Sequence, residues 1–209
     1  MTQRLRRRTL LVLTAALALA SPALAAFPAS EPDDMTMGSA KAPVTLIEYA
    51  SASCPHCARF NNDVFPAFKT KYVDTGKVRY VFREFLTEPA QVAAAGFLLA
   101  RCAPSGKYFK VVDDFFHGQA KMYETGDLKA LVLSVGKNAG LTEDQAMACF
   151  KDDAAAKALN ERVTRHSNEG VNSTPTFVIN GTKLADLDHE ATLADLDAAI
   201  QPLLKPGRR

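Results

Sequence analysis

The chain has 209 residues, of which 47% are hydrophobic and 23% are charged. This length and apolar content suit a single domain with an ordinary hydrophobic core, or such a domain with a large insertion. The formal net charge is only +2. The composition therefore excludes the strongly basic field with which many proteins attract nucleic acids.

The first 26 residues have the pattern of a secretory signal peptide. A basic start is followed by a short apolar stretch, Leu10–Ala20, and by the small-residue cleavage pattern Ala23-Leu24-Ala25. The apolar stretch is well short of the roughly 20 residues that a membrane span needs, which disfavours an uncleaved anchor. We expect export, with cleavage after Ala25 or Ala26. All 23 acidic residues but only 21 of the 25 basic ones lie beyond this point, so the mature chain carries a net charge of −2.

The segment after the signal peptide predicts two strands joined by a helix. Residues 27–43 are rich in Pro, Asp, Met and Ala, and we expect a lead-in that ends in a short edge strand near Met35–Gly38. β-rich runs predict core strands over Val44–Ala50 and Val78–Phe85. Between them, apolar residues from Phe60 to Phe68 mark one face of a helix. Such a βαβ unit should have parallel strands.

Strand character is then absent from about residue 88 to residue 169. Apolar spacing and polar helix formers predict helices over Val92–Cys102, Leu128–Val135 and Asp153–Glu169. A further helix begins at Thr142–Gln145, which has the pattern of a capping box, and its apolar face includes Cys149. We expect this part of the chain to be entirely helical.

Strand character returns near the C-terminus. Thr176–Ile179 is β-rich, and Asn180-Gly181 before Thr182–Leu184 is a strong hairpin signal. A final amphipathic helix is predicted over Leu193–Leu203, and it should stop at Pro206-Gly207.

These elements predict a chain of three parts. Residues 1–26 form the signal peptide, residues 27–87 and 170–209 form an α/β domain, and residues 88–169 form an inserted all-helical domain. The order of elements therefore describes a split α/β domain.

The most informative segment is Cys54-Pro55-His56-Cys57, at the start of the first predicted helix. Two thiols three positions apart on a first helical turn face the same way and can close a small disulfide ring. Pro55 suits the first helical position, where its missing N–H is not needed. Unpaired backbone N–H groups and the helix dipole favour a negative charge on Cys54. A stabilised thiolate is the species that exchanges disulfides, so we predict thiol–disulfide exchange.

The other two cysteines, Cys102 and Cys149, are expected on apolar helical faces about 47 residues apart. An even number of cysteines in an exported protein favours disulfides, so we predict a structural bond between them. Loop entropy would make it worth about 4 kcal/mol. Buried free thiols and a regulatory pair are the alternatives.

Three features together resemble the DsbA family of bacterial periplasmic thiol:disulfide oxidoreductases, within the thioredoxin superfamily. They are the Cys54–Cys57 motif, the acidic Glu48 on the preceding strand, and Thr174-Pro175 just before the third core strand. The resemblance covers essentially the whole mature chain. It implies an α/β, thioredoxin-like fold with an inserted all-helical domain.

The resemblance also implies a role for each site residue. Cys54 is the exchanging sulfur and Cys57 its buried partner, while His56 can place a positive or hydrogen-bonding ring beside the Cys54 thiolate. Glu48 would be a buried carboxylate beneath Cys57 that passes a proton, although an exposed carboxylate at a sheet edge is the alternative. Pro175 would be a cis-proline packed against the disulfide, next to Thr174.

By the same resemblance, Thr174 would offer backbone groups to an extended substrate peptide. The implied activity is donation of the Cys54–Cys57 disulfide to reduced exported client proteins, through a mixed disulfide at Cys54. A DsbB-like membrane quinone reductase would then reoxidise the pair. We expect a periplasmic monomer with no cofactor beyond the redox-active disulfide, no metal and no nucleic-acid partner.

Two other functions stay open on the sequence. Threonine before the proline also occurs in family members that isomerise or reduce disulfides. Because Thr174 matches this feature, an isomerase or reductase is the first alternative. A periplasmic module that holds a metal through its thiols is the second alternative, although no further ligand pair follows Cys57 at zinc spacing. The scattered His117, His166 and His189 are expected at the surface or at helix caps.

Overall fold

The computed structural model describes residues 27–185 and 189–205. The predicted signal peptide and the predicted stop at Pro206-Gly207 lie outside these residues. Within them, no helix is both long enough and apolar enough to cross a membrane.

The centre of the molecule is a five-stranded sheet with the order β1-β3-β2-β4-β5. Its strands are β1 (Met35–Met37), β2 (Val44–Ala50), β3 (Val78–Glu84), β4 (Thr176–Ile179) and β5 (Thr182–Lys183). Strands β2 and β3 are parallel, which confirms the βαβ unit, and β1 and β4 add antiparallel strands on either side. The predicted hairpin joins β4 to β5, with Asn180 and Gly181 both at positive φ (47° and 82°) as its tight turn requires.

The helix after β2 is continuous but contains two wider turns. It consists of α1 (Pro55–Arg59), a π-helical turn (Phe60–Val64), α2 (Phe65–Phe68) and a second π-helical turn (Lys69–Val73). At the first wide turn the Phe65 N–H donates to the carbonyl of Phe60, five residues back. Pro66 follows directly and has no N–H to donate, so the regular helical ladder is interrupted there.

The segment between β3 and β4 is helical, as predicted. It contains α3 (Ala90–Cys102), α4 (Tyr108–Thr125), α5 (Leu128–Ala139), α6 (Glu143–Ala148) and α7 (Asp153–Asn168), and α8 (Leu193–Leu204) closes the described chain. Both halves of the capping box at Thr142 are present. The boundaries of α4 were not predicted, although its buried residues from Tyr108 to Met122 follow a helical period.

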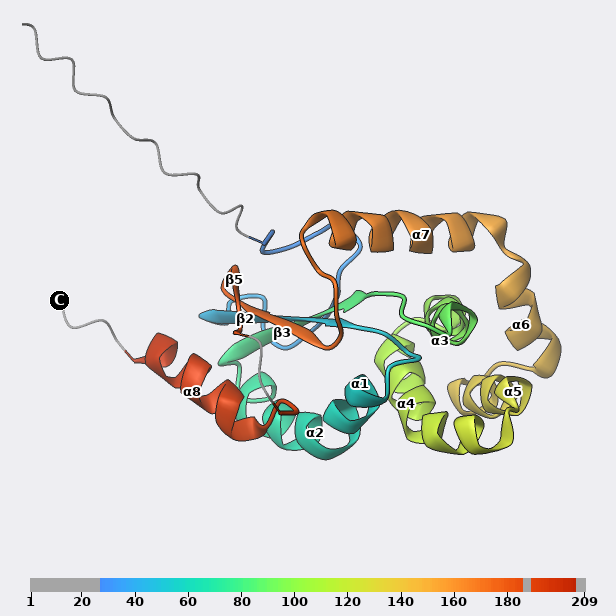
Figure 1. The fold of residues 1–209 in the computed structure, drawn as a ribbon, viewed down its shortest axis with the longest axis horizontal. Helices are drawn as coiled ribbons and strands as arrows, with labels where there is room; N and C mark the ends of the chain where they lie inside the picture. The colour runs from blue at the N-terminus through green and yellow to red at the C-terminus, as the bar shows by residue number, and fades with distance from the viewer. Residues whose placement is uncertain (1–26, 186–188, 206–209) are drawn as a thin grey trace, which may run out of the picture.

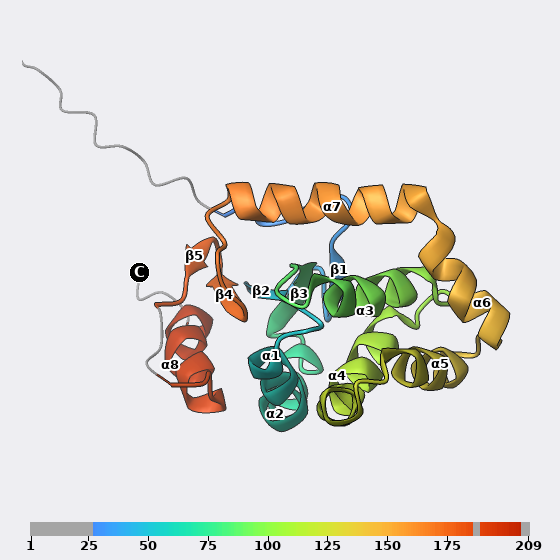
Figure 2. The same ribbon diagram turned by 45° about the vertical axis from the view of Figure 1, so that its right-hand side comes forward.

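The helices cover both faces of the sheet (Figure 1). Helix α7 runs across one face, while α1, α2 and α8 lie on the other. Helices α3 to α6 gather beyond one side of the sheet, as a second view also shows (Figure 2). One hydrophobic cluster extends from the strands into these helices, with the Phe82 ring 6.0 Å from that of Phe97 and 6.2 Å from that of Tyr108. The sheet and the helices are therefore joined by a common core.

The sheet face under α7 carries buried charges. Arg83, which is 1% exposed, donates from Nε to Asp34 (2.9 Å) and from Nη1 to the Tyr49 hydroxyl (2.7 Å), and it lies 3.2 Å from Glu31. Buried charges are tolerated only where partners replace the lost water. These ion pairs attach the segment before β1 to the sheet.

A second buried carboxylate, Glu84, ties helices of the insert to β3. It accepts hydrogen bonds from Arg101 (2.7 Å) on α3 and from Arg162 (2.6 Å) on α7. Nδ1 of His166 lies 2.8 Å from the Glu84 carbonyl oxygen, and this histidine is only 2% exposed. The expectation of a surface His166 was wrong, because α7 presses that residue onto the sheet. His117 and His189 are exposed, as expected.

Candidate active site

The reactive motif follows directly on β2, through a short loop held by serine hydroxyls. Cys54 caps the helix in an extended conformation, and Pro55 takes the first helical position. The Cys54 N–H donates to the Ser51 carbonyl at 3.0 Å. The hydroxyls of Ser51 and Ser53 lie 3.0 Å apart, and that of Ser53 donates to the Thr87 carbonyl at 2.8 Å. These bonds position the sulfur of Cys54 at the end of the sheet.

Helix α4 holds the same loop from the other side. Gln119, which is buried, donates from Nε2 to the carbonyls of Ala52 (2.8 Å) and Cys54 (3.3 Å). The Tyr123 hydroxyl donates to the Ser53 carbonyl at 2.6 Å. The sequence analysis missed both residues. A polar Gln119 on the apolar face of a helix was the available signal, since buried polar side chains need partners.

Both thiols of the motif are free and nearly buried, with Cys54 7% exposed and Cys57 fully covered. The Cys54 thiol lies 3.3 Å from the Thr174 carbonyl oxygen. A hydrogen bond from Cys57 lowers the pKa of Cys54 to about 5 despite burial, with further help from the side chain of Thr174 and from the backbone N–H groups of Cys57 and His56. Burial, together with the charge on Cys54, raises the pKa of Cys57 well above its usual value. At neutral pH the pair therefore holds one thiolate and one thiol.

Glu48 is buried at the centre of β2, at 2% exposure, so the alternative of an exposed sheet-edge carboxylate was wrong. Its register partners are Phe82 on β3 and Phe177 on β4. The Tyr80 hydroxyl donates to its Oε2 at 2.6 Å. Burial raises the pKa of Glu48 to about 8, assisted by the Cys54 charge and opposed by the Tyr80 hydrogen bond. The Glu48 charge in turn raises the pKa of Cys57.

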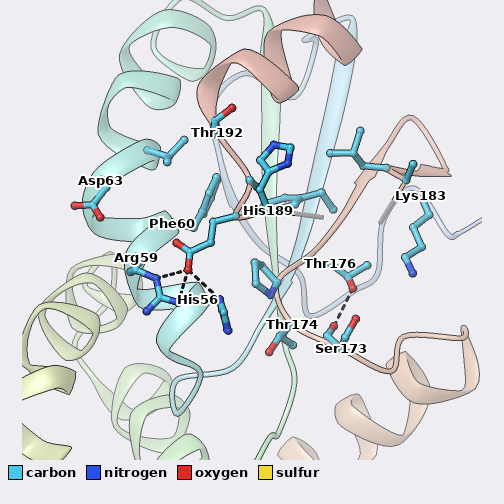
Figure 3. A pocket seen from close by; sticks show the side chains of 17 residues that line it. His56, Arg59, Phe60, Asp63, Ser173, Thr174, Thr176, Lys183, His189 and Thr192 are labelled. Atoms are coloured by element: carbon cyan, nitrogen blue, oxygen red, sulfur yellow. Dashed lines mark hydrogen bonds and ion pairs between the residues drawn. The ribbon is translucent and has the colours of Figure 1, made fainter. Parts of the chain in front are cut away.

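His56 does not have the contact that was predicted for it. Its exposed ring lies beside Glu190, with 3.1 Å between Nδ1 and Oε1, and Arg59 also binds this carboxylate (Figure 3). What reaches the Cys54 sulfur from His56 is its backbone N–H. The predicted contact between the imidazole and the thiolate is therefore corrected: Glu190 binds the ring, and the backbone N–H of His56 contacts the Cys54 sulfur instead.

The Thr174–Pro175 peptide bond is cis, as the resemblance implied. The backbone carbonyl of Thr174 meets the Cys54 thiol, so this loop closes the site from the side of β4. A second cis bond, Glu88–Pro89, precedes α3 and was not predicted.

A groove of about 710 Å³ lies between α1, the cis-proline loop and the segment before α8. Apolar side chains contribute to its wall, namely Phe60, Val64, Pro175, Phe177 and Leu184. Polar and charged side chains from His56 to Thr192 complete the lining (Figure 3). The groove is lined by His56 and Thr174, whose backbones contact the Cys54 sulfur, and it can hold an extended peptide with apolar side chains.

The second cysteine pair forms the predicted bond. Cys102 and Cys149 are joined by a disulfide with a Cα–Cα distance of 5.8 Å. Cys149 is buried, but Cys102 is exposed at the end of α3, so only one of the two lies on a buried face as expected. Among the described residues, no group of three or more His, Cys, Asp or Glu side chains is arranged to hold a metal ion.

Comparisons with known proteins agree with this architecture. The family model described as Thioredoxin matches residues 30–201. One relative is a Rickettsia bellii protein that is named as a protein-disulfide oxidoreductase. It is 29% identical over 172 residues, which cover 81% of this chain and 65% of the relative. The chain thus spans slightly less than two thirds of that relative's length.

Solved structures give the same result. Wolbachia pipientis α-DsbA1 is 28% identical, with a TM-score of 0.73 over 84% of this chain and 92% of that one. A protein-disulfide isomerase from Novosphingobium aromaticivorans has a TM-score of 0.69 over 83% of this chain and 98% of that one, and at 23% identity it supports the fold alone. The family match over most of the chain and the shared fold identify this protein as a DsbA-like member of the thioredoxin family.

Proposed function

We propose that this protein is a thiol:disulfide oxidoreductase that donates the Cys54–Cys57 disulfide to reduced exported proteins. The observation that carries the proposal is the opposite pKa shift of the two thiols, with Cys54 lowered to about 5 and Cys57 raised. The names of the relatives support the same class of reaction. We infer the direction of exchange, from this protein to its clients, from the lowered pKa of Cys54.

In the first step a client thiolate attacks the Cys54 sulfur of the oxidised pair. The bond between Cys54 and Cys57 breaks, a bond between the client and Cys54 forms, and Cys57 leaves as a thiolate. Glu48, with a pKa of about 8, carries a proton at neutral pH and can neutralise Cys57. A proton donor is needed because Cys57 is fully buried.

In the second step another client thiolate attacks the client sulfur of the mixed disulfide. Cys54 then leaves as a thiolate, and the client has lost two electrons to the Cys54–Cys57 pair. The low pKa of Cys54 makes it a good leaving group, since a stabler thiolate departs faster. Meanwhile the groove beside the cis-proline can hold the client chain in an extended form.

The thiolate also makes the reduced protein the favoured product. Against an ordinary thiol pKa of 9.0, a Cys54 pKa of about 5 stabilises the reduced form. At pH 7 only the interval from 5 to 7 counts, which is roughly 3 kcal/mol or about 60 mV. Because the pKa is lowered, this contribution grows as the pH rises from about 5 towards 9 and vanishes below about 5.

The setting of this reaction belongs to the same proposal. The signal-peptide pattern before Ala26 supports export, and we infer a periplasmic monomer whose clients are other exported proteins. A DsbB-like membrane quinone reductase would accept the two electrons from the reduced pair. No cofactor other than the disulfide is required by these steps.

The decisive experiment is the redox equilibrium of the Cys54–Cys57 pair against glutathione, with Cys102–Cys149 left intact. We expect a potential well above the value of about −270 mV for thioredoxin. Cys54→Ser, which removes the exchanging sulfur, is the control for the signal. A potential at or below that of thioredoxin would favour the isomerase or reductase instead.

A trapping experiment separates the enzyme from a metal-binding module. Cys57→Ser keeps the Cys54 thiolate, which can attack the disulfide of an oxidised client in the reverse of the second step, and it removes the Cys57 thiol that would release that client. An oxidoreductase with this change should accumulate covalent complexes with clients that reductant releases. If Cys57→Ser traps no client and loses a bound metal, the proposal is wrong.

A further inference from the structure

Glu190 bridges the groove beside the reactive sulfur. It lies in the segment before α8, 134 residues from His56 in the chain, yet its Oε1 is 3.1 Å from the Nδ1 of His56. Arg59, one turn further along α1, also forms an ion pair with this carboxylate. One acidic side chain thus binds both basic side chains of α1, His56 and Arg59 (Figure 3).

The contacts of the His56 ring depend on its proton. Nδ1 also lies 2.8 Å from Nη2 of Arg59. A ring nitrogen either donates or accepts, so Nδ1–H can bind Glu190, or an unprotonated Nδ1 can accept from Arg59. In both states the ring is occupied by this cluster.

We propose that Glu190 is a positioning residue that holds His56 and Arg59 at the groove and so keeps both side chains off the Cys54 sulfur. The inference rests on the proposed function, because it concerns how strongly the Cys54 thiolate is stabilised. It predicts that the wild-type protein is a weaker oxidant than a variant in which His56 and Arg59 are free to approach the Cys54 thiolate.

The surroundings of Cys54 explain why this matters. Cys54 interacts with four titratable groups of the described chain, namely Cys57, Glu48, Arg59 and Tyr123, and it also accepts from the backbone N–H of His56. Arg59 is close enough for the thiolate to raise its pKa, yet Glu190 raises it more. Removing the Glu190 charge should let Arg59 and the imidazole of His56 interact more strongly with the Cys54 thiolate, which contributes more to the raised pKa of Arg59 than Asp63 does.

The test is a double-mutant cycle of Glu190→Gln and His56→Ser, measured by the ultraviolet titration of the Cys54 thiolate and by the equilibrium with glutathione. Glu190 is half exposed, so Glu190→Gln should leave the fold intact. We expect Glu190→Gln to favour the reduced form about threefold, which is about 14 mV. His56→Ser should then have a larger effect in the Glu190→Gln background than in the wild type, because only there is the ring free.

Asp63→Asn is the matched control. Asp63 lines the same groove and also raises the pKa of Arg59, but it has no hydrogen bond to His56 in the structure. The inference is overturned if Glu190→Gln leaves the thiolate pKa unchanged. It is equally overturned if Asp63→Asn gives the same shift and His56→Ser acts equally in both backgrounds, since Glu190 would then be a remote charge only.

Failure of this inference can be told from failure of the proposed function. The function depends on the wild-type potential, whereas the role of Glu190 depends on differences between variants. A low wild-type potential with an intact Glu190 effect would refute the donor role and leave the positioning role standing.

Discussion

The two cysteine pairs of this protein lie at opposite ends of helices. Cys54 caps the N-terminus of α1, where free N–H groups and the helix dipole stabilise a thiolate. Cys102 is the last residue of α3, and Cys149 follows the last residue of α6. At a helix C-terminus the dipole disfavours negative charge, so a thiolate gains nothing there.

This difference explains how one residue type serves two purposes in one chain. The Cys54 and Cys57 thiols are free in the structure and would close only a short ring when oxidised, and the lowered pKa of Cys54 stabilises their reduced form. The Cys102–Cys149 pair closes a loop of 47 residues in the helical part, with no comparable support for its reduced form. The position on the helix, together with loop length, separates a reactive bond from a structural one.

The largest effect should come from Cys54→Ser. We expect complete loss of disulfide exchange with glutathione and with client thiols, because no other sulfur of the motif is positioned for attack. Unfolding should remain cooperative and near wild type. Measurable exchange in this variant would show that the second pair is also reactive, and the contrast between the pairs would fail.

Removing the second pair with Cys102→Ser and Cys149→Ser should lower the free energy of unfolding by about 4 kcal/mol. The potential of the Cys54–Cys57 pair should stay close to that of the wild type, because α3 and α6 do not carry the thiolate's hydrogen bonds. Denaturant unfolding and the glutathione equilibrium measure the two quantities separately. A shift of the potential comparable to the thiolate's own contribution would make the second pair regulatory.

Glu48→Gln should separate stability from catalysis at the reactive pair. The pKa of Glu48 is raised from 4.5 to about 8, so folding at pH 7 forces a proton onto a carboxylate that would be ionised in the unfolded chain. Replacing it should stabilise the protein by up to roughly 3 kcal/mol at pH 7, and by less as the pH falls towards 4.5.

The same variant should exchange disulfides more slowly, by roughly a hundredfold, since Cys57 loses its proton donor. In the wild type the rate should fall as the pH rises through about 8, and Glu48→Gln should lack this step. Stopped-flow exchange over a pH series measures it. An unchanged rate and pH profile would remove Glu48 from the mechanism.

The smallest effect should come from Gln119→Leu on α4. The loss of its hydrogen bonds to the carbonyls of Ala52 and Cys54 leaves buried acceptors without this donor, at a cost of roughly 1–3 kcal/mol of stability. The exchange rate should fall only modestly, because the backbone N–H groups at Cys54 remain. Tyr123→Phe removes one hydrogen bond to the same loop and should have a smaller effect. If Gln119→Leu slowed exchange more than Glu48→Gln does, α4 would control the reactive loop.

Local patterns in the sequence determined much of this protein. The strands, the parallel βαβ unit, the capping box at Thr142 and the hairpin at Asn180 each depend on residues close together in the chain. The helix start at Cys54 is local too, and with it the origin of the reactive thiolate. Such features follow from hydrophobic period, turn chemistry and helix capping, which act over a few residues.

Only the tertiary structure decided the partners of the polar side chains. Two of these contacts join distant parts of the chain: Glu190 holds His56 from 134 positions away, and Gln119 supports the Cys54 carbonyl from 65 positions away. The burial of His166 depends on how α7 packs on the sheet. No local pattern encodes these contacts, because a polar side chain has several possible partners until packing brings one within reach. The chemistry of Cys54 was therefore visible in the sequence, while the surroundings that tune it depend on the fold.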